Sequence, residues 1–472
     1  MDEDERDFYT NEELTEVINR FNKALTENKI EYFDVFECEG LADYFLDEDK
    51  LKSAEQVIQM GLSIHPDSVA LQIKNAQIQL LNGDPKQCLA TITLAESVEQ
   101  TNPDVYLVKG SALITLGRTT EAIEAYQLSI RYNYEEKDDL LYSIAVTLGQ
   151  AGETDHAIDF LNEAHQSNPQ NELVLYELGF YHDKKQDFKT CIHFYNLYLD
   201  IDPFNASVWY NLGIAYNRLG NEDKAIEAYD YAIVLQDDFE QAYYNKANAL
   251  SNSNQYEKAI DCYKEYIKRD KHNDDAYCYL GECYLNLERH QEALMNYRKA
   301  TRLNKSNPNG WYGAGLIMWM EGKLTDAQVF LKKSIKLDDA NPDYWLIYGK
   351  INTELENFQQ AETAFEKATS LDPDNSDGWI SFAEMEYEKG CLNDAIQILK
   401  NALTIIEGDS GINYRLTAYL LENNDELTAT NYLEKALEID VDCYRDLFDY
   451  YPAAKQNESI RKVIKEHQST KL

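Results

Sequence analysis

The sequence predicts an all-α protein, a solenoid of about twelve helix-turn-helix repeats. Two observations support this prediction: a 34-residue period runs through most of the chain, and two slots of each period hold small side chains. When every repeat is numbered so that Trp209 falls at position 4, position 8 is Gly, Ala or Thr and position 20 is Ala or Cys. Helices that cross about 8–10 Å apart accept only small residues at the contact, so these slots mark where the two helices of a repeat meet.

The elements follow in order from this register. The repeats are predicted to begin at residues 35, 69, 103, 138, 172, 206, 240, 274, 308, 342, 376 and 410. Prolines cluster at the boundaries, and Asn102, Asn307 and Asn341 precede three of them as expected N-caps. The chain is thus predicted to divide into an acidic N-terminal segment with a capping helix (1–34), the repeats (35–443) and C-terminal capping helices (444–472).

Both caps have sequence signals of their own. Thr10 and Glu13 predict a capping box for a helix whose apolar face is built from five residues. These are Leu14, Val17, Ile18, Phe21 and Leu25. This helix is expected to cover the first repeat. At the other end, two closing helices are expected at 444–451 and 459–467, on either side of Pro452.

The repeating motif is typified by one segment: Trp209, Leu212, Gly213 and Tyr216, followed by Ala225, Tyr229 and Ala232. This pattern resembles that of the tetratricopeptide repeat (TPR) family. The resemblance implies a right-handed superhelix in which the first helix of each repeat lines a concave groove and the second forms the outside. It also implies a protein or peptide partner in that groove. No repeat has Lys at position 5, so the carboxylate clamp of TPR co-chaperones, and with it an acidic C-terminal peptide ligand, is not expected.

Composition limits the function classes. The 472 residues include 84 acidic and 44 basic side chains, a formal net charge of −40, which argues against direct binding of nucleic acid or anionic lipid. A partner more basic than acidic is therefore expected. No apolar run long enough for a transmembrane helix occurs, and the acidic N-terminus does not resemble a secretory signal. The eight cysteines form no CxxC and predict reduced core thiols, hence a cytoplasmic protein.

Motifs of enzyme chemistry are absent from the sequence. It contains no phosphate-binding loop, no dinucleotide fingerprint, no HExxH and no GxSxG. The eight histidines are scattered, and Cys278 and Cys283 are spaced so that they do not lie one above the other on a helix. We therefore expect no catalytic residues, no cofactor and no metal site.

Candidate binding residues lie at the expected groove positions. Position 5 holds tyrosine in several middle repeats, and positions 6 and 9 add asparagines; Cys278 interrupts the series and is expected to face the groove. These residues are Tyr142, Tyr176, Tyr210, Tyr244 and Tyr312 with Asn211, Asn245 and Asn248. One hypothesis is that they hold an extended peptide by stacking and by hydrogen bonds to its backbone. The alternative is that they only pack adjacent helices.

At groove positions 5, 9, 12 and 13 the ninth repeat is more apolar than the seventh and the eleventh, with Tyr312, Leu316, Trp319 and Met320. Because Trp311 fills the packing slot, Trp319 is interpreted either as an interface anchor or as a residue buried against a neighbouring repeat. Charge also changes here: residues 255–340 contain 14 basic and 13 acidic side chains, and the cations recur on second helices. This stretch is either a surface for an acidic or lipid-facing partner, a self-association surface, or simply a less acidic face.

Together these patterns predict a non-enzymatic scaffold or adaptor that binds a partner segment in its groove. Two other functions remain open. One is an acidic chaperone or assembly factor that shields a basic client protein. The other is a fixed subunit of a larger complex, with peripheral attachment to a membrane translocation apparatus as one example.

Overall fold

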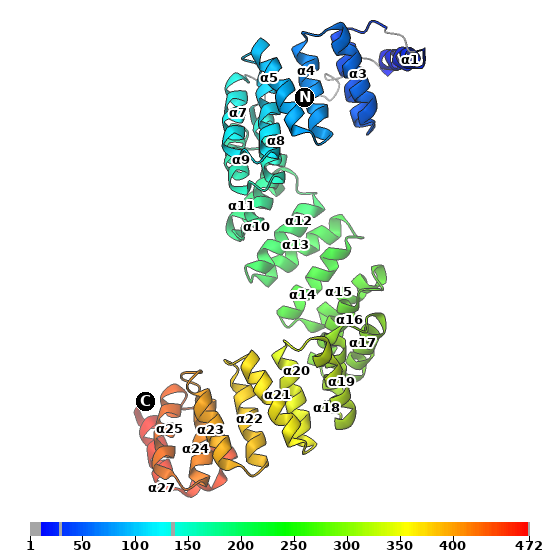
Figure 1. The fold of residues 1–472 in the computed structure, drawn as a ribbon. Helices are drawn as coiled ribbons and strands as arrows, with labels where there is room; N and C mark the ends of the chain where they lie inside the picture. Colours follow the sequence, from blue (N-terminus) through cyan, green and yellow to red (C-terminus); the bar gives the residue numbers. More distant parts are fainter. Residues whose placement is uncertain (1–10, 28–30, 134–136, 471–472) are drawn as a thin grey trace. The chain divides into compact units, whose positions relative to one another are not determined.

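The computed structural model describes residues 11–27, 31–133 and 137–470, and this part of the chain is built from α-helices, turns and one short 3-10 helix (Figure 1). Two compact units divide the helices between them, Met1–Gly220 and Asn221–Leu472. In the described ranges, none of the helices has the length and apolar character that crossing a bilayer requires. The predicted capping box at Thr10 and Glu13 depends on Thr10, which lies outside the described residues.

The helices of unit 1 are α1 (Asn11–Glu27), α2 (Val35–Asp47), α3 (Leu51–Ile64), α4 (Val69–Leu81), α5 (Pro85–Val98), α6 (Pro103–Thr115), α7 (Thr119–Tyr132), α8 (Lys137–Gln150), α9 (Thr154–Ser167), α10 (Glu172–Lys184), α11 (Phe188–Ile201) and α12 (Ala206–Arg218). Unit 2 begins with α13 (Glu222–Leu235), α14 (Glu240–Asn252), α15 (Tyr256–Arg269), α16 (Asp274–Asn286), α17 (His290–Leu303), α18 (Pro308–Met320), α19 (Leu324–Leu337) and α20 (Pro342–Glu354). It continues with α21 (Phe358–Leu371), α22 (Ser376–Glu388), α23 (Leu392–Ala402), α24 (Ser410–Glu422), α25 (Glu426–Ile439), α26 (Tyr444–Tyr450), the 3-10 helix η2 (Pro452–Gln456) and α27 (Glu458–Thr470). The even-numbered helices α2 to α24 are the predicted first helices, and the odd-numbered helices α3 to α25 are the second helices.

A turn with the same backbone conformation joins the two helices of every repeat. Position 15 has a positive φ in all twelve repeats, from 55° at Asp49 to 88° at Gly152 and Gly390. Six of these residues are glycine, and six are not: Asp49, Gln186, Asn254, Glu288, Glu356 and Asn424. The left-handed conformation lets the second helix turn back onto the first. Its recurrence in every repeat confirms the predicted register.

The core slots behave as the register requires. Every residue at position 20 is fully buried, including Cys88 and Cys191. Burial raises the pKa of Cys88 to about 11 and that of Cys191 to about 12, so both thiols stay protonated at neutral pH. The predicted core thiols are thereby confirmed at these two slots.

Position 8 packs directly on position 24 of the same repeat. A Cβ added to Gly110 would lie 2.4 Å from the ring of Tyr126, and one added to Gly179 would lie 2.4 Å from the ring of Tyr195. Where position 8 is alanine or threonine, position 24 is isoleucine or leucine in every repeat except one, Ala247 with Tyr263. Small and large side chains therefore compensate at most crossings, as close packing demands, with Gly315 and Leu331 of the ninth repeat as a second exception.

The three predicted asparagine N-caps are confirmed. Asn102, Asn307 and Asn341 each accept a backbone N–H bond from the first turn of their helix. In α1, Val17 and Phe21 are buried against the first repeat, but Leu25 is 38% exposed, so its expected place in the apolar face is wrong. The C-terminal helices are joined by η2, which the sequence did not predict. The three-part division at residues 34 and 443 stays a prediction.

Candidate peptide-binding groove

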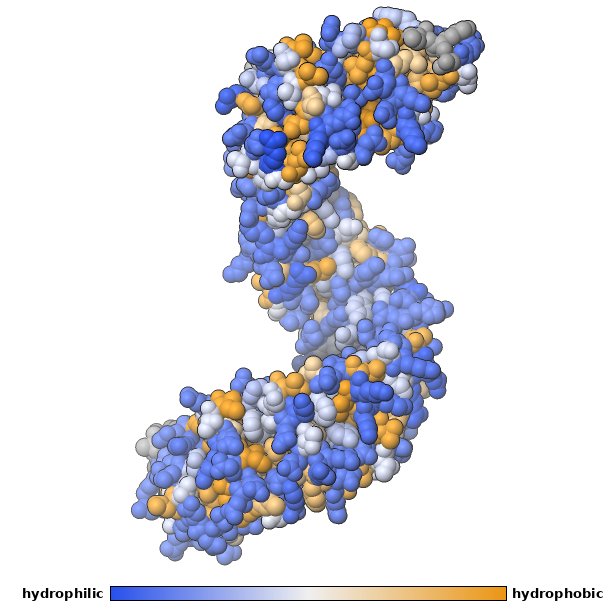
Figure 2. All heavy atoms as spheres, in the orientation of Figure 1, coloured by the Kyte–Doolittle hydropathy of each residue, from blue (hydrophilic) through white to orange (hydrophobic). Residues whose placement is uncertain are grey.

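A groove of about 450 Å³ lies along the first helices at the C-terminal end of unit 2. Its walls come from α18, α20, α22 and α24, with Tyr450 of the cap helix α26 at one end. Buried Phe365 and Met385 lie beneath it. We call this site the first-helix groove. Figure 2 shows that, on the face it draws, hydrophobic side chains form only small groups among hydrophilic ones.

Carboxylates outnumber cations in the first-helix groove. It is lined by Glu354, Asp377, Glu384 and Glu388, against Lys350 and Arg415. The two cations are already paired inside the groove. Lys350 Nζ lies 2.8 Å from Asp377 Oδ2, and Arg415 pairs with Glu384. Glu354 and Glu388 therefore carry the groove's excess negative charge.

The excess of carboxylates in the groove affects the pKa of Glu388. Partial burial, together with the nearby carboxylates of Glu384 and Glu354, raises the pKa of Glu388 above its usual value. Arg415 cannot relieve this repulsion because its guanidinium stacks 3.4 Å from the ring centroid of Tyr450 while it pairs with Glu384. An incoming cation would therefore relieve repulsion between groups that are already in place.

Trp319 stands at the edge of this groove in a fixed orientation. Its indole N–H donates to Glu354 Oε1 of the next repeat at 2.6 Å, and its ring packs against the buried cluster that contains Met318. The side chain is half-buried, so the structure combines the two interpretations left open by the sequence. Met320 beside it is 56% exposed.

Tyr312 and Leu316 complete the apolar set of the ninth repeat. Both are half-buried. The ring of Tyr312 lies 4.9 Å from that of Tyr344 in the next first helix, and burial raises the pKa of Tyr312 to about 12. Tyr312 therefore stays protonated at neutral pH and can still donate a hydrogen bond.

In unit 1, the position-5 tyrosines are partly buried, and Tyr176 contacts two neighbouring helices. Tyr142, Tyr176 and Tyr210 are half-buried on α8, α10 and α12. The side-chain amide of Asn211 donates to Tyr176 Oη at 3.4 Å, and the Tyr176 ring packs 6.1 Å from that of Tyr195. The contact with Asn211 joins two successive first helices, α10 and α12, and the contact with Tyr195 joins the two helices of one repeat. Each of the three tyrosines keeps an exposed part.

Unit 2 continues the series with the same kind of contact. The ring of Tyr244 lies 5.0 Å from that of Tyr266, and Asn248 accepts a hydrogen bond from Tyr263 Oη. Asn245 is half-buried as well. Cys278 does not face the groove as expected: it is only 5% exposed, and its thiol donates to Asn307 Oδ1 at 3.8 Å. The start of the next first helix, α18, covers it.

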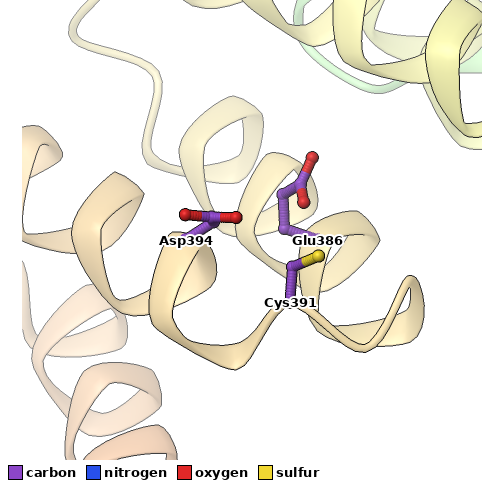
Figure 3. Close-up of side chains that lie close together, drawn as sticks. All are labelled: Glu386, Cys391 and Asp394. Atoms are coloured by element: carbon purple, nitrogen blue, oxygen red, sulfur yellow. The ribbon is translucent and has the colours of Figure 1, made fainter.

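One thiol and two carboxylates converge at the turn between α22 and α23 (Figure 3). Ligand atoms of Glu386, Cys391 and Asp394 lie within 4.8 Å of one another. The arrangement follows from the turn itself, because Cys391 is the N-cap of α23 and Asp394 sits in its first turn, where the helix dipole favours an acid. The ammonium of Lys389, 3.0 Å from Glu386, already supplies a positive charge to this cluster.

Sequence reasoning did not select the acidic residues of the groove. Glu384 and Glu388 fall at positions 9 and 13 of the eleventh repeat, and Glu354 falls at position 13 of the tenth. The repeat register gives their positions in the groove, but in a chain of net charge −40 single acidic residues do not stand out. The contribution of Tyr450 depends on how the C-terminal cap folds back, which the repeat pattern does not contain.

Comparison with known protein families decides the nature of the repeats. Models described as tetratricopeptide repeat match residues 103–136, 206–239, 244–308 and 342–375. The chain contains tetratricopeptide repeats. Three of the matched segments begin at 103, 206 and 342, which are predicted repeat starts.

Solved structures similar to this TPR protein include a crystal structure of MamA, with 25% identity over 36% of this chain and 93% of that one, and a TM-score of 0.35. YrrB, described as a TPR protein with an unusual peptide-binding site, shares 22% identity over 39% of this chain and 95% of its own, with a TM-score of 0.33. Yeast Tom70 shares 16% identity over 92% of this chain and 98% of its own, with a TM-score of 0.42. No curated protein sequence matches the chain.

Proposed function

We propose that this TPR protein is a non-enzymatic scaffold that binds an extended, basic segment of a partner protein in the first-helix groove. The observation that carries the proposal is the excess charge of Glu354 and Glu388, which neither Lys350 nor Arg415 neutralises. A lysine or arginine side chain of the partner would pair with these carboxylates. The helices that hold them are preformed, so little ordering cost falls on the scaffold.

Trp319 is the proposed anchor at the edge of the groove. Because Glu354 holds the indole in one orientation, an apolar partner side chain meets a rigid surface bordered by Leu316 and Met320. In each unit taken by itself, the exposed parts of the tyrosine and asparagine series are proposed to contact the backbone of a bound peptide. That series is Tyr142, Tyr176, Tyr210 and Asn211 in unit 1, and Tyr244, Asn245, Asn248 and Tyr312 in unit 2. The eight free cysteines support a reducing, cytoplasmic location.

A chaperone for a basic client is the second candidate function. It is favoured by the net charge of −40, because 84 acidic side chains extend far beyond one groove. A chaperone of this kind would hold its client through the general negative field, whereas a scaffold would use the first-helix groove. Removing charge inside and outside the groove separates the two.

The test is a titration of a fluorescein-labelled peptide of about twelve residues, with arginines separated by two neutral residues, at about 50 mM salt. Wild type is compared with Glu354→Gln/Glu388→Gln, in which the amide oxygen introduced at position 354 can still accept the hydrogen bond from Trp319. The matched control, Asp223→Asn/Glu227→Gln, removes the same charge from exposed residues of α13. We expect the groove variant to weaken binding by about tenfold and the control by less than about threefold.

Two results bear on these functions. An equal loss in both variants would favour the chaperone. The absence of peptide binding by wild type would contradict both functions. Trp319→Ala should also weaken binding, by about 1–3 kcal/mol, if it is an anchor.

A further inference from the structure

The outer surface of unit 2 carries a bounded row of cations. At position 25 of five successive second helices, the residues are Asp230, Lys264, Arg298, Lys332 and Glu366. At position 29, cations again occupy only the middle three helices: Lys268, Arg302 and Lys336. All six cations are exposed and lie on α15, α17 and α19 (Figure 1). The row is thus three repeats wide and ends at an acidic residue on either side.

Most of these cations lack an acidic partner. Within the described residues, only Lys268 of the six forms a salt bridge, with Glu265 on its own helix. Lys264, Arg298, Arg302, Lys332 and Lys336 form none, although acidic side chains outnumber basic ones by 84 to 44 in the whole chain. Nearby Lys333 is held over the ring of Trp311, 4.1 Å from its centroid. Salt bridges within the protein therefore leave most of the positive charge of this surface unneutralised.

Two exposed apolar side chains adjoin the cations. Met295 on α17 is 71% exposed and Val329 on α19 is 53% exposed. Both occupy position 22, about one helical turn before Arg298 and Lys332. Methionine and arginine, as at Met295 and Arg298, are enriched at protein–protein interfaces.

We propose that this surface, the outer basic patch, binds an acidic segment of a partner protein lying across α15, α17 and α19. Carboxylates of the segment pair with Arg298, Arg302, Lys332 and Lys336, and its apolar side chains contact Met295 and Val329.

The flanking acids favour a short protein segment over a larger polyanion. Asp230 and Glu366 lie at the same position on the next helices, and the screening length at physiological salt is about 8 Å. A membrane surface or a DNA duplex would extend beyond three helices and meet these acids, of which Asp230 pairs with Lys246 and Glu366 forms no salt bridge within the described residues. A segment of several residues would fit between them.

The test uses a fluorescein-labelled peptide of about twelve residues, in which glutamate alternates with serine and leucine, at about 50 mM salt. Wild type is compared with Arg298→Glu/Lys332→Glu. The matched control, Lys52→Glu/Lys189→Glu, makes the same charge change at exposed lysines of unit 1. The proposal predicts a loss of about tenfold or more in the patch variant and less than about threefold in the control.

The milder variant Arg302→Ala/Lys336→Ala is used in case charge reversal disturbs folding. It should also weaken binding of the peptide. The proposal is overturned if wild type does not bind the peptide, or if patch and control variants lose affinity equally. Binding to phosphatidylserine vesicles or duplex DNA but not to the peptide would overturn it as well. The basic peptide of the groove serves as an internal control, because its binding should survive the loss of the outer basic patch.

Discussion

Two faces of unit 2 present opposite charge on one repeated framework. In the first-helix groove, Glu384 and Glu388 occupy positions 9 and 13, whereas in the outer basic patch, Arg298 and Arg302 occupy positions 25 and 29. Both faces rest on the same buried slots, with alanine fully buried at position 20 in each of these repeats. The difference teaches that packing fixes a few positions per repeat and leaves each face free to acquire its own charge.

This separation makes a sharp prediction about the effects of substitutions. Changes at the framework positions should affect folding and leave the character of the two faces intact. Changes at the face positions should affect binding and leave folding intact. A substitution that violated this division would show that framework and faces are coupled.

The largest effect is expected at position 20. Ala293 is fully buried between α16 and α17, and leucine there would force the helices apart. We expect Ala293→Leu to lower the free energy of unfolding by about 3 kcal/mol, measured by urea denaturation. The control Ala90→Leu, on the exposed side of α5, should stay within about 0.5 kcal/mol of wild type. Equal stability of the two variants would contradict the repeat register, on which the assignment of both faces depends.

The next effect tests compensation between positions 8 and 24. Gly179→Ala places a Cβ 2.4 Å from the Tyr195 ring and should cost about 1–2 kcal/mol, after a gain of about 1 kcal/mol in helix propensity. Adding Tyr195→Leu recreates the alanine–leucine pairing of the fourth and eleventh repeats.

A double-mutant cycle should therefore show a favourable coupling of about 1 kcal/mol or more. Gly281→Ala is the matched control, since its Cβ would lie 3.1 Å from Tyr297 and should cost less. Additive effects of Gly179→Ala and Tyr195→Leu would contradict the compensation.

The sequence predicts the framework positions better than the two faces. The repeat register, the buried small slots and the N-caps at Asn102, Asn307 and Asn341 were predictable, because each repeats with the helical period or has a local cap signal. The left-handed turn was not, since Glu288 and Glu356 show no preference for that conformation. There, the packing of two helices imposes the conformation on whichever residue falls at position 15.

The acidic groove was only partly predictable. Trp319 stood out because Trp311 already fills the packing slot of the same repeat, so a second tryptophan is not required there. Glu354 and Glu388 did not stand out, because their charge matters only when the nearby cations are already paired. Lys350 pairs with Asp377 and Arg415 pairs with Glu384, and these pairs are visible only in the structure. Cys278 was misplaced for a similar reason: the next repeat covers it.

The third prediction sharpens the contrast between the two faces through pH. Because the pKa of Glu388 is raised, this carboxyl is partly protonated in weak acid and becomes fully charged only at higher pH. Affinity for the basic peptide should therefore increase by about two- to threefold as the pH rises from 5 to 7. Affinity of the acidic peptide for the outer basic patch should lack this rise, since Arg298 and Lys332 stay charged throughout.

Anisotropy titrations with each peptide at several pH values measure the difference. Glu388→Gln should flatten the pH dependence of the basic peptide, and Glu366→Gln on the outer surface should leave it unchanged. A slope that persists in Glu388→Gln would assign the titration to another group.

The smallest effect concerns the turn that joins the helices of each repeat. Glu288 adopts φ 57°, where glycine is less strained, so Glu288→Gly should raise the free energy of unfolding by about 0.5 kcal/mol, measured by urea denaturation. Asn424 at φ 60° is the matched comparison, because asparagine tolerates the left-handed region and Asn424→Gly should gain almost nothing. A larger gain at Asn424 than at Glu288 would contradict this explanation. Peptide binding at both faces should not change in either variant, because the turn belongs to the framework and presents no side chain to the groove or to the outer basic patch.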